Sequence, residues 1–385
     1  MKLSILYKEF FNSEKSGGII LVLVTFISLL LANSAFSDEY TSFWSAKLAG
    51  YSVAHWINDG LMAVFFLLIG LELEREIYLG ELSNLKNAAF PFFAAIGGMV
   101  LPAALFLVFN YGTEFQNGTG IPTATDIAFA IGILALLGNK VPLSLKIFLT
   151  ALAVIDDLGA IIIIAIFYSK SLSIINLSIS LGIWAVLLIL NRSKVYNIIP
   201  YILGGIAMWY FMHHSGVHAT ITGVLLAFAI PFTNGRKKSP SYKLQHALHK
   251  PVAFIILPLF AMANTGIIIG SDWVSGLTQS NSLGIILGLA VGKPLGILLF
   301  SLLGVGLGLC MIPSELNWKN ILGAGFLGGI GFTMSIFITI LAYDDQTIIN
   351  NSKIAILLAS LVAGVIGYTF LKLTLKETVI DQEEE

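Results

Sequence analysis

The feature that most constrains this chain is a series of apolar runs, each about as long as a membrane-crossing helix. A helix needs roughly 20 mostly apolar residues to cross the hydrocarbon core of a bilayer. Because lipid offers the backbone no hydrogen-bond partner, each run is expected to be helical. The sequence therefore predicts an all-α polytopic membrane protein with about 12 transmembrane helices, near residues 16–34, 57–74, 88–111, 118–138, 143–168, 172–191, 196–213, 216–233, 248–270, 282–308, 319–343 and 352–374.

Composition excludes a soluble protein of this size. Of the 385 residues, 57% are hydrophobic and only 11% are charged, whereas a soluble domain has about 25% charged residues. The net charge is −1 and the basic residues are scattered, which excludes the basic patch that a nucleic-acid-binding protein needs. The single cysteine, Cys310, excludes an internal disulfide framework and a multi-cysteine metal site.

The distribution of Lys and Arg predicts the orientation of the chain in the membrane. With the N-terminus inside, 17 of the 21 Lys and Arg residues fall on the cytoplasmic side, and Lys47, Lys170 and Lys353 fall outside. The start of the chain resembles a signal peptide, but the many later spans favour an uncleaved first helix. We therefore expect a cytoplasmic N-terminal segment (1–15), one transmembrane domain (16–374) and an acidic cytoplasmic tail (375–385).

The polar connections between the predicted spans are short, so no separate soluble domain is expected. One of them, residues 40–56, alternates loosely between polar and apolar residues around Ala49 and Gly50. This pattern predicts either a small external β-hairpin or an ordinary loop.

Two of the predicted spans contain helix-breaking residues. The fourth reads GTGIPTATDIAFAIGIL, with a break at Pro122, and the eleventh reads GAGFLGGIGFTMSIFITIL, with a glycine cluster at 328–331. A break is tolerated in a membrane only where protein or water surrounds the freed backbone groups. The two spans lie seven apart and so run in opposite directions. Interrupted segments in oppositely oriented halves indicate a transporter with inverted-topology repeats, here spans 3–5 and 10–12.

Four ionisable residues lie well inside the predicted spans: Asp126, Asp156, Asp157 and Lys293. An ionised side chain at the bilayer centre costs roughly 2.5–3.5 kcal/mol on insertion scales. Such residues therefore indicate a functional site, and buried ion pairs that only fix helix packing are the alternative. Asp59 lies nearer the end of its span, and a helix N-cap explains it equally well.

Asp156 and Asp157 are adjacent in the run ALAVIDDLGAIIIIAIFY (151–168). Successive helical residues point about 100° apart, so the two carboxylates cannot both face one atom head-on. One can face an ion while the other faces a neighbour such as Lys293.

Thr125 and Asp126 stand beside the predicted break at Pro122. Free helix ends at a break leave partial charges that a carboxylate or an ammonium can balance, so Lys293 is also expected near the crossing of the broken helices. A buried carboxyl group that either holds a proton or binds a cation can exchange one for the other. Its oxygen ligands suit Na⁺ or Li⁺, and the predicted core has no His or Cys cluster for a transition metal.

Seven segments, in order along nearly the whole chain, resemble those of the bacterial NhaA sodium/proton antiporters: WINDGLMAVFFLLIGLELEREI, TATDIAFAIGIL, ALAVIDDLGAIIIIA, GVHATITGV, ILPLFAMANTG, VGKPLGI and GGIGFTMSIFI. The resemblance implies a pH-regulated, electrogenic transporter of the bacterial inner membrane that exchanges internal Na⁺ or Li⁺ for external protons by alternating access and serves sodium and pH homeostasis. It implies no enzymatic activity and no cofactor. It also implies a core bundle (about 88–168 and 282–374) and an interface bundle (about 16–74 and 172–270) that can dimerise.

The resemblance also implies roles for individual residues. Asp157 is the expected principal cation ligand, with Asp156 as a partner that can pair with Lys293 and trade protons, and Thr125 and Asp126 match the broken-helix positions. A second set, linked in the family to the pH response and expected at the cytoplasmic face, comprises Glu72, Arg75, Glu76, His218, His246 and His249. Histidine titrates in a suitable range for such a role, although an ordinary charged surface is the alternative.

Two positions depart from the family pattern. Gln245 stands where an acid is expected beside His246, and Glu74 stands where a base is usual. The transport site is therefore expected to be shared with the family, while the pH threshold can differ.

Two other functions remain open at this point. An intramembrane aspartyl protease also needs two acids, but it places them on different helices across a water molecule. A passive channel usually has a symmetric ring of carbonyls or acids, which one asymmetric chain does not supply.

Overall fold

The structure is a computed structural model that describes residues 14–169, 171–233, 239–270 and 273–375. The predicted N-terminal segment 1–15 lies outside the described residues except for residues 14 and 15, and the predicted tail 375–385 does so except for residue 375. Helices account for most of the described chain, and its one sheet has two strands.

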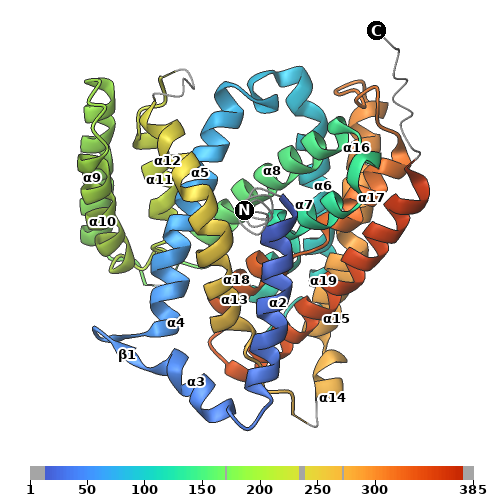
Figure 1. Ribbon diagram of the computed structural model, residues 1–385, viewed down its shortest axis with the longest axis horizontal. Coiled ribbons are helices and arrows are strands. Elements are labelled where there is room, and N and C mark those ends of the chain that lie inside the picture. The colour runs from blue at the N-terminus through green and yellow to red at the C-terminus, as the bar shows by residue number, and fades with distance from the viewer. Residues whose placement is uncertain (1–13, 170, 234–238, 271–272, 376–385) are drawn as a thin grey trace, which may run out of the picture.

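The elements follow one another along the chain as in Figure 1. They are α2 (Glu14–Ala32), α3 (Ser37–Ser45), β1 (Lys47–Leu48), β2 (Tyr51–Ser52), α4 (Val53–His55), η1 (Trp56–Leu61), α5 (Met62–Tyr78), η2 (Glu81–Ser83), α6 (Leu85–Asn110), η3 (Gln116–Thr123), α7 (Ile127–Leu136), η4 (Gly138–Lys140), α8 (Leu143–Phe167), α9 (Ile174–Arg192), α10 (Ile199–His213), α11 (Ile221–Ala229), α12 (Pro240–Pro251), η6 (Val252–Ile256), α13 (Leu257–Thr265), α14 (Trp273–Leu277), α15 (Ser280–Leu287), η7 (Gly288–Gly292), α16 (Lys293–Gly306), α17 (Trp318–Gly328), α18 (Phe332–Ala342) and α19 (Gln346–Thr374).

Among the described residues, eight helices are long and apolar enough to cross a membrane, or up to ten if each of two bent pairs is one span. The bent pairs are α2 with α3, at 113°, and α17 with α18, at 48°. Helices α10 and α11 occupy the predicted seventh and eighth spans but have only 15 and 9 residues. The protein is therefore a multi-pass helical membrane protein, while twelve spans and inverted repeats stay predictions.

The segment between the first two predicted spans contains a β-hairpin. Strands β1 and β2 are antiparallel, with Lys47 opposite Ser52 and Leu48 opposite Tyr51. The turn residues Ala49 and Gly50 have φ angles of 50° and 91°, as a tight two-residue hairpin turn requires. Of the two expectations for residues 40–56, the hairpin is therefore confirmed.

Asp59 is not a helix N-cap. The cap of this helix is Ser52, whose side chain accepts a hydrogen bond from the backbone N–H of His55 at 3.1 Å. Asp59 lies seven residues after this cap, within η1. Because Asp59 lies inside the helix rather than at its start, its carboxylate is not used for capping and can contact side chains from other segments.

Polar side chains cap several helix starts that the structure describes. Asp345 precedes α19, and its side chain accepts hydrogen bonds from the backbone N–H groups of Ile348 and Thr347. These bonds hold the pKa of Asp345 below its ordinary value because they stabilise the ionised form.

Close packing through glycine joins helices that are distant in the sequence. Figure 1 shows α9 and α10 at one side of the molecule and α16, α17 and α19 at the other, with α8 between them. Between α6 and α16, a Cβ added to Gly97 would lie 2.1 Å from the carbonyl oxygen of Gly296, and the reverse distance is also 2.1 Å. Small residues of this kind let membrane helices approach closely. The division into a core bundle and an interface bundle stays a prediction.

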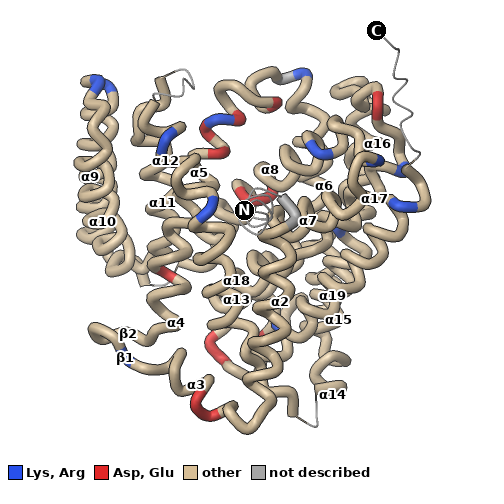
Figure 2. Tube along the Cα trace, in the orientation of Figure 1, with Lys and Arg blue, Asp and Glu red and all other residues tan. Residues whose placement is uncertain are grey.

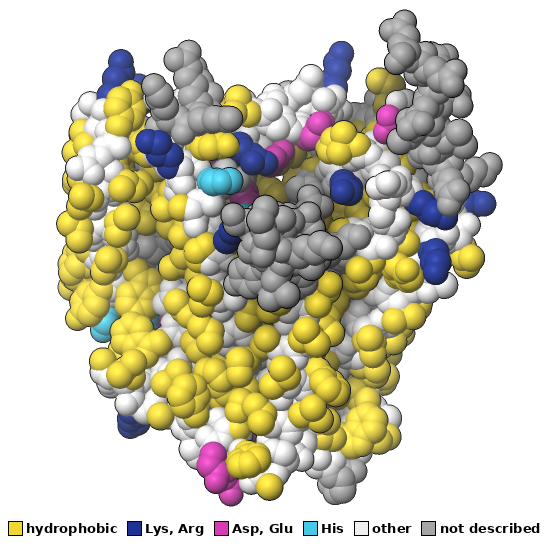
Figure 3. Space-filling view, viewed as in Figure 1, with side chains coloured by type: hydrophobic (Ala, Val, Ile, Leu, Met, Phe, Trp, Pro, Cys, Tyr) yellow, Lys and Arg dark blue, Asp and Glu magenta, His cyan; other side chains and the backbone are white. Residues whose placement is uncertain are grey.

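The surface has the character expected of a protein in lipid. Apolar side chains cover much of the face in Figure 3 between its charged ends, and residues such as Phe26 and Ile174 are 60% and 76% exposed. Figure 2 shows most Lys and Arg residues at the end of the molecule where α19 ends, opposite β1 and α3. This is the asymmetry that the predicted orientation needs, although the orientation itself stays a prediction.

We expect Gly296→Ala to destabilise the protein, because the added methyl group would meet the backbone of α6 and overpacking typically costs about 1–3 kcal/mol. The measurement is the midpoint of thermal unfolding of the purified protein in detergent. The control is Gly182→Ala in α9, where no heavy atom lies within 4 Å of the added Cβ. Unchanged midpoints for both variants would contradict the close approach of α6 and α16.

Candidate functional site

The four charged residues predicted inside the spans are all buried. Asp156 and Asp157 lie in the middle of α8, Asp126 directly precedes α7, and Lys293 begins α16. The exposed fraction of each is 2% or less. At this depth neither water nor lipid can solvate the charges, so the protein itself must do so.

Both predicted breaks are present, and the non-helical segments lie against each other. Residues 124–126 separate η3 from α7, and residues 329–331 separate α17 from α18. The backbone N–H of Asp126 donates to the carbonyl of Ile330 at 2.6 Å, and the Thr125 hydroxyl lies 2.8 Å from the carbonyl of Gly328. Each segment therefore satisfies backbone groups that the other frees, which is how interrupted helices persist within a membrane.

Asp126 caps two helices with one carboxylate. Its Oδ1 accepts a hydrogen bond from the backbone N–H of Phe129 in α7 at 3.0 Å. Its Oδ2 accepts from the backbone N–H of Thr333 at 3.1 Å and from the Thr333 hydroxyl, at the start of α18. A carboxylate there balances the partial positive charge of both helix N-termini. Both oxygens are engaged in this conformation, and a role for Asp126 as a cation ligand stays a prediction.

Lys293 pairs with one of the two adjacent acids. Its Nζ lies 2.9 Å from Oδ2 of Asp156 and donates a hydrogen bond to the carbonyl of Thr123, at the C-terminal end of η3. Cations are favoured at that end of a helix. Lys293 directly follows η7, a π-helical segment, and π-helical turns are frequent at functional sites.

Thr125 connects the ion pair to the crossing of the two breaks. Its Oγ1 lies 2.8 Å from Oδ2 of Asp156 and 2.8 Å from the carbonyl oxygen of Gly328. A hydroxyl group has one hydrogen and can also accept. When Asp156 is ionised, both acceptors compete for that hydrogen, whereas a protonated Asp156 can donate to Thr125, which then donates to Gly328. The hydrogen bonding at the crossing therefore depends on whether Asp156 carries a proton.

Asp157 stands apart from these partners. Neither of its carboxylate oxygens has a hydrogen-bond partner among the described residues, although both are buried. A buried carboxylate without partners carries a large desolvation cost, and native proteins rarely retain such a group without a use. Its two oxygens are thus available to a proton or a hard cation.

The predicted pH-response residues are only partly brought together. Glu72 and His249 lie 3.7 Å apart between Oε1 and Nδ1, and Arg75 lies 3.3 Å from Glu76. His246 stacks on its neighbour Tyr242 in α12. These residues lie at the C-terminal end of α5 and on α12.

His218 does not lie with this set, so its expected place at the same face is wrong. Helices α5 and α11 are parallel, because Gly223 packs against Ala63 and Gly70 packs against Ala227. His218 precedes α11 and therefore lies near the opposite end of α5 from Glu72. There its Nε2 is 2.8 Å from the carbonyl oxygen of Tyr168, just beyond α8.

Several contributors to the site were not predicted from the sequence. Thr333 binds Asp126, and its position two residues after the glycine break in GGIGFTMS was the available signal. The carbonyls of Thr123, Gly328 and Ile330 have no sequence signal, because every residue has a carbonyl group.

Glu74, one of the departures from the family pattern, is buried and accepts a hydrogen bond from the Ser241 hydroxyl at 3.1 Å, which joins α5 to α12.

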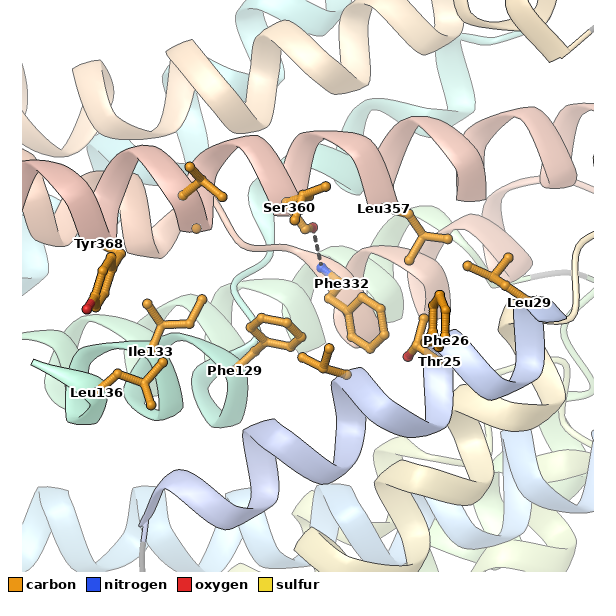
Figure 4. A pocket seen from close by; sticks show the side chains of 14 residues that line it. Thr25, Phe26, Leu29, Phe129, Ile133, Leu136, Phe332, Leu357, Ser360 and Tyr368 are labelled. Carbon is orange, nitrogen blue, oxygen red and sulfur yellow. Dashed lines mark hydrogen bonds between the residues drawn. The ribbon is translucent and has the colours of Figure 1, made fainter.

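A separate apolar pocket of about 410 Å³ lies between α2, α7, α18 and α19 (Figure 4). Phe129, Phe332 and Leu357 line it. The Ser360 hydroxyl accepts a hydrogen bond from the backbone N–H of Phe332, and the Thr25 hydroxyl donates to the carbonyl of Leu21. Because these two hydroxyls are satisfied internally and most of the lining side chains are apolar, this pocket suits hydrocarbon rather than an ion.

Comparisons with known proteins show which family the chain is similar to. The model of the family described as Na⁺/H⁺ antiporter 1 matches residues 8–371. A Na⁺/H⁺ antiporter NhaA of Flavobacterium psychrophilum is 66% identical over 383 residues, which cover 100% of both chains. One from Cytophaga hutchinsonii is 61% identical over 385 residues, again 100% of both. One from Vibrio cholerae serotype O1 is 48% identical over 377 residues, 97% of this chain and 99% of the relative.

We expect neutralisation of Asp156 and neutralisation of Asp157 to have different effects on the stability of the protein. Asp156→Asn leaves the buried ammonium of Lys293 without its counter-charge, which costs about 3–5 kcal/mol. Asp157→Asn removes a buried charge that has no such partner and should leave stability unchanged or higher. The measurement is the midpoint of thermal unfolding in detergent, with Asp156→Asn/Lys293→Gln expected to recover part of the loss. Equal losses for the two single variants would contradict the different surroundings of the two carboxylates.

Proposed function

The chain belongs to the Na⁺/H⁺ antiporter 1 family, and on that premise we propose that it extrudes Na⁺ or Li⁺ from the cytoplasm in exchange for external protons. The observation that carries the proposal is Asp157, a buried carboxylate whose oxygens have no hydrogen-bond partner among the described residues. Oxygen ligands of this kind suit hard cations. A cation and a proton neutralise the same group and exclude each other there, which couples their movements.

Asp156 and Lys293 are proposed to supply the second part of the coupling. A cation at Asp157 lies beside Asp156, attracts its carboxylate and competes with Lys293 for it. Thr125 would follow the change, since it shares its hydroxyl between Asp156 and the opposite break. If the coupled groups release more than one proton for each Na⁺ bound, the exchange is electrogenic. Because buried coupled groups titrate as a set, the protons belong to the site rather than to one residue.

We infer that the site opens alternately to the two sides of the membrane. The crossed breaks are joined by a few hydrogen bonds, from Thr125 and Asp126 to the carbonyls of Gly328 and Ile330, rather than by continuous helix. Movement of a core bundle against an interface bundle would change these contacts with little loss of helix. The proposed setting is the bacterial inner membrane, with both termini cytoplasmic, and the concentration of Lys and Arg at one end supports that orientation. A homodimer is proposed on the family resemblance alone.

The surroundings of the two acids support a transporter rather than an intramembrane aspartyl protease. Such a protease needs two carboxylates that face each other across a water molecule. Here they are neighbours on α8, and Asp156 is engaged by Lys293 at 2.9 Å. No cofactor is needed for the proposed exchange.

Transport in everted membrane vesicles tests the proposal. Wild-type vesicles should show Na⁺-dependent proton release, read from the fluorescence of a pH-gradient dye. Asp157→Asn should abolish it, with folded protein at the wild-type level, because the group that binds either ion is gone. Asp345→Asn is the matched control, since this acid lies outside the site and asparagine also caps helices. Full exchange by Asp157→Asn would overturn the proposal.

The pH response is proposed to reach the site through Glu72. This acid pairs with His249 on α12 and also interacts electrostatically with Asp157. A negative charge near Asp157 disfavours the ionised form of that carboxylate and so favours its neutralisation by a proton or by a cation. Removal of the Glu72 charge would therefore weaken the hold of the site on its proton and change the pH at which exchange begins.

We expect Glu72→Gln to shift the pH profile of exchange to lower pH, because removal of this charge makes the proton at the site easier to release. The measurement is Na⁺-dependent proton flux against pH, with Glu39→Gln in α3, an exposed acid, as the control. A shift to higher pH, or the same shift in both variants, would exclude this link.

A further inference from the structure

We propose that His55, Asp59 and His213 form a binding site for a divalent transition-metal ion such as Zn²⁺. The three residues lie where the β1–β2 hairpin and η1 meet the end of α10. They belong neither to the acids around Lys293 nor to the Glu72 and His249 pair. One ligand atom from each lies within 4.8 Å of the other two.

The distances suit a small metal ion. Oδ2 of Asp59 is 3.2 Å from Nδ1 of His213 and 3.6 Å from Nε2 of His55. In a tetrahedral zinc site with bonds of about 2.0–2.2 Å, ligand atoms lie about 3.3–3.6 Å apart. Two edges of the triangle are thus near the required length, and the edge between the imidazoles can be adjusted by side-chain rotation. Two histidines and one carboxylate are a common protein ligand set for zinc with an open fourth position.

Local structure explains why the three side chains meet. Ser52 caps α4, so the helix that continues into η1 starts just before His55. His55 and Asp59 are four residues apart and lie on one face of that helix. His213 is the last residue of α10 and approaches from a separate helix. The spacing H-x-x-x-D was therefore the only local signal in the sequence.

Outer contacts orient both imidazoles. Nε2 of His213 lies 3.3 Å from the hydroxyl of Tyr51, which leaves its Nδ1 to face Asp59. Metal-binding histidines usually engage their other ring nitrogen in this way. The ring of Tyr51 also stacks on His55, and Trp209 stacks on His213.

The site is accessible and still lacks a full set of partners. The three side chains are between 18% and 32% exposed, so an ion can reach them and water can complete its coordination. Nε2 of His55 is itself buried and has no hydrogen-bond partner among the described residues. Imidazole nitrogen favours Zn²⁺, Ni²⁺ and Cu²⁺ over Na⁺ and Mg²⁺. This donor set is therefore distinct from the carboxylate oxygens proposed for the transported ion.

Metal titration of the purified, tag-free and chelator-treated protein tests the proposal. By isothermal titration calorimetry we expect the wild type to bind one Zn²⁺ per chain and no Mg²⁺ at the same concentration. The cobalt-loaded protein should show the visible absorption of a tetrahedral site. His213→Ala should lose this binding. His214→Ala, which removes the adjacent imidazole whose Nδ1 lies against the carbonyl oxygen of Tyr210, should retain it.

The outer shell provides a finer test. Tyr51→Phe keeps the ring that stacks on His55 but removes the hydroxyl beside His213, and loss of such a partner typically weakens metal binding about 10–100-fold. Should His213→Ala not fold, as judged by its elution profile in detergent, His55→Gln removes a ligand from the other segment and decides the question in the same way. Absence of stoichiometric Zn²⁺ binding by the wild type would overturn the proposal, and so would undiminished binding by the ligand variants.

Discussion

The ion pair between Asp156 and Lys293 is the interaction on which the centre of this protein depends. A buried charge in a membrane has no solvent, so a charge that is held there permanently must be met by an opposite charge or by a helix end. The interruptions in the two spans provide those ends: Lys293 meets the carbonyl of Thr123, and Asp126 meets the start of α7 and α18. The breaks and the charges therefore explain each other, since either one alone would be costly in lipid.

Much of the fold could be predicted from hydrophobic run length and from glycine and proline, because lipid leaves the backbone few choices. The broken spans and the pairing of Asp156 with Lys293 are both found in the structure. Other features could not be predicted, because they depend on which helix faces meet. The hydrogen bonds to backbone carbonyls are hidden from sequence for this reason. The place of His218 is not, because the second and eighth predicted spans run in the same direction, which puts His218 at the opposite end from Glu72, as the parallel packing of α5 on α11 shows.

The adjacent acids show how function and stability separate within a single turn of α8. Asp156 is held by Lys293 and Thr125, whereas Asp157 has no hydrogen-bond partner among the described residues. A group that must bind and release an ion in turn cannot also be bound firmly by protein donors, because those donors would compete with the ion. The missing stabilisation of Asp157 is thus what the proposed exchange requires, and the firm pairing of its neighbour limits the cost to one residue.

The same reasoning distinguishes the proposed metal site from the proposed transport site. His55, Asp59 and His213 are held by aromatic stacking and by the Tyr51 hydroxyl, and they lie where an ion would join η1 to α10. Both elements fall within the predicted interface bundle, so a metal ion there would brace one bundle internally without linking it to the other. Because the two proposed sites differ in donor atoms and share no residue, a metal ion bound by His55, Asp59 and His213 is expected to raise the thermal stability of the protein while leaving Na⁺ binding at Asp157 unchanged.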